Sequence, residues 1–299
     1  MSDTAVAISY GVLEYGEFMV RRLESAQVSG SEQVTFIKNW VTKHKLKNAD
    51  CHFVLNKQEY NLELIESPHV EDAELVEAVR WRLKDLIQTP IEETAIDVFP
   101  LPNDAYRGRM RMVYVVAVAK SIIEQKLTLI RSCGLDPKVI DIEELALRNI
   151  ALYLPEVNKS TVALLGVKEN NGEIYMFSNE DMYLTRSIDL GMSSLRGEIQ
   201  TASESQHLGE MADRFVLDIQ RSLDYYESQL GKGVANSIYL LPFDAQGVDI
   251  KKILLPNLIP PIHTLDCRKF IPFSERVSPT IEEQEKVLTV IGAVLRRAA

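Results

Sequence analysis

The sequence lacks the features of a membrane-spanning, secreted or nucleic-acid-binding protein. No stretch reaches the roughly 18 apolar residues that a spanning helix requires, and the first residues show no basic start followed by an apolar run. The 43 acidic and 33 basic residues give a net charge of -10, and no basic stripe offsets it. We therefore expect a cytoplasmic protein with no nucleic acid partner.

Cysteine and histidine are too scattered to indicate a disulfide framework or a metal site. Cys51, Cys133 and Cys267 have no CxxC spacing, so buried free thiols are expected. The histidines are isolated, and we expect surface positions for His44, His52, His69, His207 and His263. The motifs G-x-S-x-G, H-E-x-x-H and G-x-x-x-x-G-K-[ST] are missing. We therefore expect no metal and no catalytic residues.

The chain is long enough for two lobes, and its first part predicts a hairpin. Its 299 residues are 46% hydrophobic and 25% charged, as in an ordinary globular protein. Strands at 4–9 and 11–25 are expected to meet at a tight turn at Gly11, with a further turn possible at Tyr15 and Gly16. A helix over 31–45 precedes a second predicted hairpin, formed by strands at 51–56 and 59–66.

An α/β unit follows. Residues 70–90 are predicted to form a helix whose apolar stripe comprises Val76, Val79, Leu83, Leu86 and Ile87. The segment 110–119 is too apolar for a strand with a wet face, so a buried strand is expected. Ser121 and Glu124 predict a capping box for a helix over 121–133, and another helix is expected over 142–154.

The same scheme begins again near residue 158. Strands are predicted within 160–168, 172–178 and 182–191, followed by a long helix over 211–230, short strands at 236–242 and 261–266, and a final helix over 280–297. The expected organisation is a first lobe over 1–157, with an inserted subdomain at about 50–135, and a second lobe over 158–299. The final helix is expected to pack back on the first lobe.

Four segments in order carry a resemblance to a known family. They are RWRLKDLIQTPIEETAIDVFPLP, IDIEELALRNIA, IQRSLDYYESQL and IGAVLRR. The chain resembles the PilM family of type IV pilus assembly proteins, and most of all its MshI branch, which serves the mannose-sensitive haemagglutinin (MSHA) pilus. The resemblance implies an α/β actin-like ATPase (ribonuclease H-like) fold, duplicated in two lobes with an inserted small α+β subdomain. It also implies a cytoplasmic protein, peripheral at the inner membrane through a single-span PilN-like or MshJ-like partner and other platform proteins.

Members of this family that bind ATP use two hairpin turns carrying Asp and Gly, so the corresponding positions bear on nucleotide binding. Ser9 and Gly11 lie in the first candidate turn, which has no acid, and Tyr10 would crowd a phosphate. Gly166 lies in the second, where the expected aspartate is apolar and Lys168 follows. Gly11, Gly166 and Gly247 are expected to supply positive φ angles in turns, with residual phosphate contact as the alternative.

The third element is an adenosine loop, which is usually rich in glycine. Here the segment 242–247 has side chains at every position before Gly247, which opposes close backbone approach. With Ser9, Gly11, Gly166 and Gly247 as degenerate phosphate-loop positions, we expect no bound cofactor and a pseudo-ATPase. ATP with Mg²⁺ stays open as the alternative.

Trp81 and a group of arginines are the candidate partner-binding residues. Trp81 lies nearly opposite the apolar stripe of its helix, so it is expected either to anchor a partner or to be covered by the adjacent lobe. Arg107, Arg109 and Arg111 would share one side of an extended strand and meet acidic lipid or an acidic partner; a solvated hairpin tip is the simpler interpretation.

Three hypotheses for function follow. The first is a scaffold that presents a groove, between its first lobe and the inserted subdomain, to an extended membrane-protein tail. The second is an ATP-binding conformational switch of the same machine. The third is another actin-like branch, such as the cytoplasmic domain of a general secretion protein of the GspL type. A thermal-shift assay with Mg²⁺ and ATP distinguishes the first two.

Overall fold

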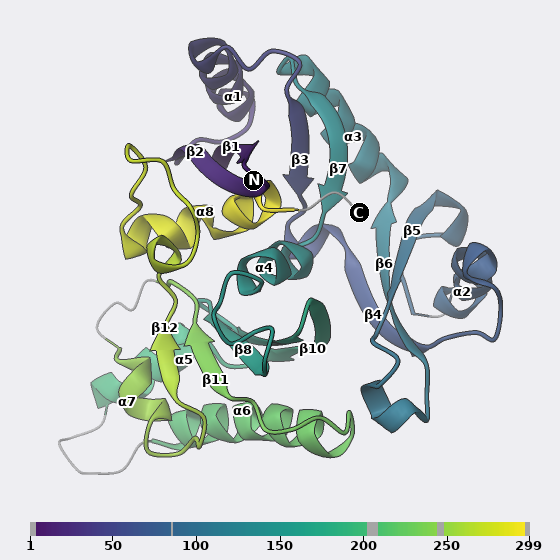
Figure 1. Cartoon of the computed structure of the whole chain (residues 1–299), viewed down its shortest axis with the longest axis vertical. Helices are drawn as coiled ribbons and strands as arrows, with labels where there is room; N and C mark the ends of the chain where they lie inside the picture. Colours follow the sequence, from purple (N-terminus) through teal and green to yellow (C-terminus); the bar gives the residue numbers. More distant parts are fainter. Residues whose placement is uncertain (1–3, 85, 202–208, 244–247, 297–299) are drawn as a thin grey trace.

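The computed structural model describes residues 4–84, 86–201, 209–243 and 248–296 (Figure 1). Among these residues, none of the helices combines the length and apolar character that crossing a bilayer requires. Within the described ranges the strands form four sheets: two pairs, a three-stranded sheet and a five-stranded sheet. The bounds of the predicted lobes and of the insertion at 50–135 stay predictions, because pairing of strands does not by itself define domains.

The chain opens with the predicted hairpin, but its turn lies further along. β1 (Val6–Glu14) pairs antiparallel with β2 (Glu17–Ala26), and the turn is made by Tyr15 and Gly16, whose φ angles are 53° and 86°. Two successive positive φ angles are typical of the tight turns that match the twist of a hairpin. The turn predicted at Gly11 is wrong: Gly11 lies inside β1, at a register shift.

The second predicted hairpin is also wrong. β3 (Asp50–Val54) pairs in parallel with β7 (Asp136–Asp141), and β4 (Asn61–Glu66) belongs to another sheet. Both strands were correctly placed, but the short 3-10 turn at Lys57–Glu59 redirects the chain instead of reversing it. α1 (Ser31–His44) precedes β3, as predicted.

β4 joins a small antiparallel sheet in the order β4-β6-β5, with β5 spanning Thr94–Pro100 and β6 Met112–Ala119. β6 is central and buried along most of its length, which explains its continuous apolar sequence. α2 (Leu75–Leu83) covers this sheet with Leu75, Val79 and Leu83. Leu86, predicted on the same stripe, is 51% exposed because the helix ends before it.

α3 (Lys120–Ser132) leads from β6 to β7 and begins earlier than predicted. Its N-cap is Ala119, which has no side-chain cap, so the predicted capping box of Ser121 and Glu124 is wrong. The helix follows the strand without a loop, which leaves no room for a separate capping residue. α4 (Glu143–Ala151) lies after β7.

The later part of the chain forms a five-stranded sheet in the order β10-β9-β8-β11-β12. α6, predicted as a helix over 211–230, packs on it with the buried side chains of Phe215, Ile219 and Tyr226. Figure 1 shows α6 along the lower edge of the molecule. The elements are β8 (Thr161–Val167), β9 (Gly172–Ser178), β10 (Asp181–Ile188), α5 (Met192–Thr201), α6 (Glu210–Ser228), β11 (Ser237–Leu240), α7 (Ile250–Leu254) and β12 (Ile262–Thr264).

α8 (Ile281–Val294) returns to the earlier part of the chain and packs against β1, β2, β3 and α4. It begins with a capping box in which Thr280 and Glu283 bond each other's backbone. Its apolar face is buried through Val287, Ile291 and Ala293. α8 therefore covers the first strands on the side opposite α1 and α3 (Figure 1).

Candidate functional site

The glycines expected in phosphate turns instead allow close packing between strands and their neighbours. Gly11 and Gly166 both lie within strands, and neither has a positive φ angle, so the predicted turn role is wrong for both. A Cβ atom on Gly11 would lie 2.1 Å from Val294 Cγ1 of α8. A Cβ atom on Gly166 would lie 3.3 Å from Leu241 Cδ1. Gly247 lies outside the described residues.

Lys168 lies in the turn between β8 and β9, where it forms ion pairs with two carboxylates. Its Nζ atom lies 3.1 Å from Glu143 Oε1 and 3.2 Å from Glu173 Oε2. Lys57 forms ion pairs with Glu144 and Glu173, and Glu144 is fully buried. Lys168 is exposed, with 46% of its side chain accessible, and its charge is paired with the carboxylates of Glu143 and Glu173.

This group, which we call the Glu/Lys cluster, comprises Lys57, Glu143, Glu144, Lys168 and Glu173. Burial raises the pKa of Glu143, although Lys168 opposes this. Burial also acts to raise the pKa of Glu173, but Lys168 and Lys57 outweigh it and the pKa is lowered. For both lysines burial lowers the pKa, and the carboxylates more than reverse it. Three carboxylates and two ammonium groups thus leave no surplus positive charge for an anion.

Two tyrosine hydroxyls complete the cluster. Tyr60 donates a hydrogen bond to Glu144 Oε2 at 2.6 Å, and Tyr175 donates to Glu173 Oε2 at 2.6 Å. The carboxylates therefore have hydrogen-bond partners as well as cations, which is what buried charges require. The cluster links the turn before β4, the start of α4 and the β8–β9 hairpin. Sequence analysis noted Lys168 alone, because the other members are separated by long stretches of chain.

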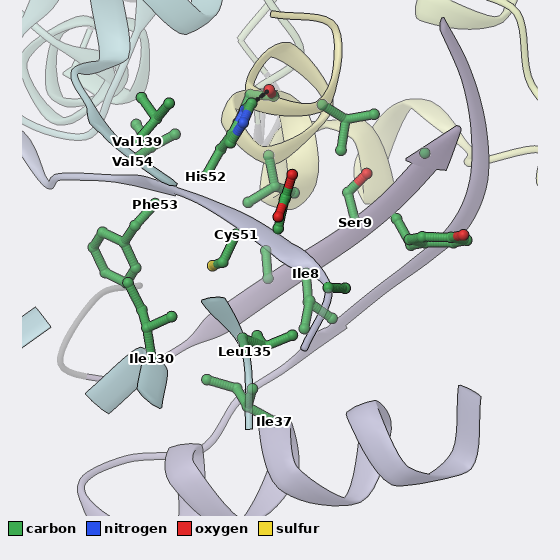
Figure 2. A pocket seen from close by; sticks show the side chains of 18 of the residues that line it. Ile8, Ser9, Ile37, Cys51, His52, Phe53, Val54, Ile130, Leu135 and Val139 are labelled. Carbon is green, nitrogen blue, oxygen red and sulfur yellow. Dashed lines mark hydrogen bonds between the residues drawn. The ribbon is translucent and has the colours of Figure 1, made fainter. Parts of the chain in front are cut away.

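A cavity of about 730 Å³ lies among β1, α1, β3, α3, β7 and α8. Its walls are mainly apolar, and Figure 2 shows the side chains of Ile8, Ile37, Phe53, Ile130 and Leu135 around it. β1 and β3 both lie between the helices α1 and α3 on one side and α8 on the other. The cavity therefore occupies the strand layer itself. All the lining residues lie within 6–54, 129–139 and 289–296.

Polar groups in the cavity are few and specific. The Ser9 hydroxyl is buried and has no hydrogen-bond partner (Figure 2). His52 Nδ1 lies 3.1 Å from the Ala293 carbonyl oxygen, which fixes the ring against α8. Asp50 lies at the start of β3 with its side chain 70% exposed. An apolar recess with a few placed polar groups is the common form of a binding site.

The expected partner-binding residues come from two segments: Trp81 belongs to α2, whereas Arg109 and Arg111 lie between the 3-10 segment Ala105–Gly108 and β6. Trp81 is 78% exposed on α2, so its expected coverage by the adjacent lobe is wrong. Arg111 pairs with Asp72 at 3.0 Å, and Arg109 is exposed. Arg107 lies in the 3-10 segment Ala105–Gly108, before β6 begins, so the predicted alternation of arginines along a strand is wrong.

The segment around Arg107 docks on the five-stranded part of the chain. A Cβ atom on Gly231 would lie 2.3 Å from Arg107 Cγ, so the arginine stem lies directly on that glycine. Nearby, the Tyr106 and Tyr225 hydroxyls lie 2.8 Å apart, and Tyr183 donates to Asp104 at 3.0 Å. The three arginines are exposed in the loop between the paired strands β5 and β6, as expected for a solvated hairpin tip, and the stem of Arg107 also contacts a distant segment.

The three cysteines differ in burial. All three cysteines are free, with Cys133 and Cys267 buried and Cys51 half-buried on the cavity wall. Burial raises the pKa of the Cys51 thiol to about 11. In the part of the chain that the structure describes, no group of three His, Cys, Asp or Glu side chains is arranged to hold a metal ion. His207 lies outside the described residues.

Comparison with known proteins identifies the family of the chain and supports its fold. The family profile described as type IV pilus assembly protein PilM matches residues 62–230, which is more than half of the chain. Among curated proteins no sequence matches. A solved structure described as a PilM-PilN type IV pilus biogenesis complex is similar over 99% of this chain and 96% of its own, with a TM-score of 0.74 and 16% identity.

Two other solved structures are similar over most of the chain. The cytoplasmic domain of EpsL, an inner membrane component of the Vibrio cholerae type II secretion system, has a TM-score of 0.48 and 15% identity over 99% of this chain and 93% of its own. A Bacteroides thetaiotaomicron protein with an actin-like ATPase fold and unknown function has a TM-score of 0.42 and 12% identity, over 94% and 91%. The predicted α/β actin-like ATPase fold is confirmed.

Proposed function

Because the chain belongs to the PilM family of type IV pilus assembly proteins, we propose that it is an adaptor that holds the cytoplasmic tail of a PilN-like inner-membrane protein at a pilus assembly platform. The observation that carries this proposal is the apolar cavity of about 730 Å³ among β1, β3 and α8. With the insertion placed at 50–135, this cavity is lined by the two ends of the insertion, within 50–54 and 129–135, by the rest of the first lobe and by α8. The protein is then cytoplasmic and peripheral at the inner membrane through its partner.

Charge supports an inner-membrane partner. Cytoplasmic segments next to a membrane span carry an excess of Lys and Arg, and this chain has a net charge of -10. Such a tail is attracted over a distance and then held by apolar contacts. Ordering a flexible tail has an entropic cost, so the affinity is expected to be modest and reversible.

The experiment is a calorimetric titration with a synthetic peptide of the partner's cytoplasmic tail. We expect saturable binding with a dissociation constant at tens of micromolar or below. The control is a scrambled peptide of the same composition, which keeps the charge and loses the order of the apolar residues. No binding above that control contradicts the proposal.

Trp81, Arg109 and Arg111 provide a second proposed contact, with the partner or another platform protein. The Trp81 indole is 78% exposed, so it contributes little to the packing of α2. Trp is enriched among the residues that dominate interface energies. Arg109 is exposed on the same three-stranded unit, and Arg111 is only loosely held by an exposed Asp72. These groups suit an acidic surface with an apolar pocket.

We further propose that the protein is a pseudo-ATPase. Gly11 is in close contact with α8. In the Glu/Lys cluster, Glu143 and Glu173 neutralise the positive charge of Lys168. A phosphate would meet carboxylates in this region, and like charges repel. The rival function is an ATP-driven switch. A ligand at a hundred times its dissociation constant adds about 2.7 kcal/mol of stability, so an upward thermal shift with Mg²⁺ and ATP would favour the rival.

The branch of the family is also a proposal. The four segments that resemble MshI support an MSHA-type pilus and an MshJ-like form of the partner. Affinity purification from membranes of cells that carry both MSHA-type and other type IV platforms tests this. Enrichment of a non-MSHA platform alone would contradict the branch and leave the adaptor role intact.

A further inference from the structure

A smaller pocket lies on the side of the first hairpin that faces α1. Its volume is about 230 Å³, and its lining consists of Tyr10, Val12, Arg21, Arg22 and His44. Four of these residues belong to β1 and β2, and His44 is the last residue of α1. Of the five, Tyr10 alone also lines the cavity of about 730 Å³. The pocket is therefore a separate candidate site, outside the cavity proposed to hold the tail.

A β-bulge in the hairpin brings both arginines to this pocket. Tyr10 lies opposite Arg22 in the pairing of β1 with β2. The next pair joins Gly11 to Val20, which leaves Arg21 as the extra residue of β2. Successive side chains of a regular strand point to opposite faces, whereas a bulge re-aims a side chain. Two consecutive arginines can therefore line one pocket, which a regular strand would not allow.

The pocket offers hydrogen-bond donors that the protein itself leaves unused. Among the residues that the structure describes, neither the Tyr10 hydroxyl nor the His44 ring makes a hydrogen bond, and Arg22 pairs with no carboxylate. Arg22 donates one bond, from Nη1 to the Arg21 carbonyl oxygen at 2.7 Å, which orients the guanidinium and leaves its other N–H groups free. Arg21 differs, because it forms an ion pair with Glu14. Arg22 is therefore the cation of the pocket that remains available to a ligand.

The charges around the pocket favour an anion. Burial lowers the pKa of His44, and the charges of Lys43 and Arg22 lower it further. Glu24 acts in the opposite direction, with a smaller effect. Lys43 and Arg22 thus both lie close enough to His44 to act on its charge. An anion beside this ring would be attracted by two cations and opposed by one carboxylate.

The C-terminus of α1 acts against an anion, but only weakly. The N–H groups of Lys45 and Leu46 bond the carbonyl oxygens of Thr42 and Val41, so these oxygens already have donors. The effect of a helix dipole falls off within the last turn and is screened by salt. Charge-assisted hydrogen bonds from a guanidinium are among the strongest in proteins, so the arginine contact outweighs the dipole.

We propose that this pocket binds a phosphate group. A guanidinium presents two parallel N–H groups that match two phosphate oxygens, which makes arginine the preferred residue for phosphate recognition. The Tyr10 hydroxyl and the His44 ring can donate to the remaining oxygens. The group can belong to a lipid headgroup or to a soluble phosphate compound, because the recognising chemistry is the same. This inference goes beyond the adaptor function and does not depend on it.

The first arm of the test uses inorganic phosphate, with binding measured by equilibrium dialysis at low and constant ionic strength. We expect saturable binding by wild-type protein and a loss of at least about tenfold in affinity for Arg22→Gln. Arg22→Lys keeps the charge but not the planar fork, so it should lie between the two. The matched control is Arg276→Gln, which removes an exposed arginine outside the pocket and should bind as wild-type protein does. Urea unfolding of each variant shows that the fold is intact.

The second arm identifies the source of the phosphate group by flotation with vesicles of phosphatidylcholine, with and without phosphatidylglycerol. If a lipid headgroup is the source, wild-type protein and Arg276→Gln float with the phosphatidylglycerol vesicles, and Arg22→Gln floats at least about tenfold less. If the source is soluble, inorganic phosphate binds and none of the proteins floats. Either pattern supports the site, because both require Arg22.

Two results would overturn the proposal. The first is that neither inorganic phosphate nor the vesicles bind wild-type protein. The second is that each probe binds wild-type protein and Arg22→Gln within about threefold, which would mean an adventitious ion only.

Titration with the tail peptide keeps this inference apart from the adaptor function. Arg22 does not line the larger cavity, so Arg22→Gln should bind the tail as wild-type protein does. Tail binding without phosphate or vesicle binding would leave the adaptor function standing and refute only the phosphate site. A thermal shift with Mg²⁺ and ATP that disappears in Arg22→Gln would arise in this pocket, whereas a shift that persists would favour the ATP-driven switch.

Discussion

Gly11 on β1 lies so close to Val294 on α8 that a single added methyl group would be 2.1 Å from the Val294 Cγ1 atom. The same relationship joins the first strand of the chain to its last helix. It explains why glycine is needed at a strand position that has no unusual backbone angle. A phosphate-binding role is therefore not required to account for this residue.

Gly11→Ala is expected to destabilise the protein by about 1 to 3 kcal/mol, because overpacking forces the helix or the strand to move. Urea unfolding measures the change. Val294→Ala removes the clashing methyl groups, so the double variant should lose less than the sum of the two single variants. Strict additivity would contradict the contact.

Glu144 is fully buried beside Lys57 and Tyr60, and its replacement tests the Glu/Lys cluster. We expect Glu144→Gln to cost about 1 to 3 kcal/mol, because the charge-assisted bonds are lost while Lys57 keeps Glu173 as a partner. The control is Glu169→Gln, which removes a carboxylate of higher exposure from its pair with Arg196. That change should cost less than about 1 kcal/mol.

The pH dependence of stability follows from Glu173, whose pKa is lowered in the folded state. A lowered folded pKa gives stabilisation that is present above the unfolded pKa, near about 4.3, and lost as pH falls through the folded pKa. Wild-type protein should therefore exceed Glu173→Gln by about 1 to 3 kcal/mol at neutral pH, with the difference shrinking below pH of about 4. A difference that stays constant from pH 7 to pH 3, measured by urea unfolding, would contradict this assignment.

Trp81→Ala should leave stability within about 0.5 kcal/mol, because the side chain is 78% exposed. If Trp81 anchors the partner or a platform protein, capture of the detergent-solubilised assembly should fall at least about tenfold. Ile259→Ala is the matched control, since Ile259 is 94% exposed in the second predicted lobe. Equal capture by both variants would remove Trp81 from the proposed contact.

The sequence predicted where strands and helices lie better than it predicted which strands pair with one another. β6 is apolar along its length because it is buried, and α6 has apolar residues at helical spacing because one face of it is buried. Both patterns can be read from the sequence alone. The pairing of β3 with β7 joins segments more than 80 residues apart, for which local pattern carries no information. The predicted hairpin between β3 and β4 failed for this reason.

The candidate site was predictable only in part. The prediction that the Gly11 and Gly166 positions do not hold phosphate rests on missing acids in the sequence. Their true packing roles depend on α8 and on Leu241, which are distant in the chain. The Glu/Lys cluster brings together residues 57, 143, 144, 168 and 173, and the cavity lies beside two strands, β1 and β3, that belong to different two-stranded sheets. Neither feature has a local sequence signal.

Ser9 distinguishes a ligand-binding role from a structural one, because its buried hydroxyl has no partner in the unbound protein. Ser9→Ala should leave stability unchanged or raise it by up to about 1 kcal/mol, since an unsatisfied polar group is removed. If the partner's tail bonds this hydroxyl, the same variant should bind the tail about three to tenfold more weakly. The matched control is Ser237→Ala on β11, whose hydroxyl is also buried without a partner and lies outside the cavity. Ser237→Ala should reproduce the effect on stability and leave tail affinity unchanged, so an equal loss of affinity in both variants would refute the role of Ser9.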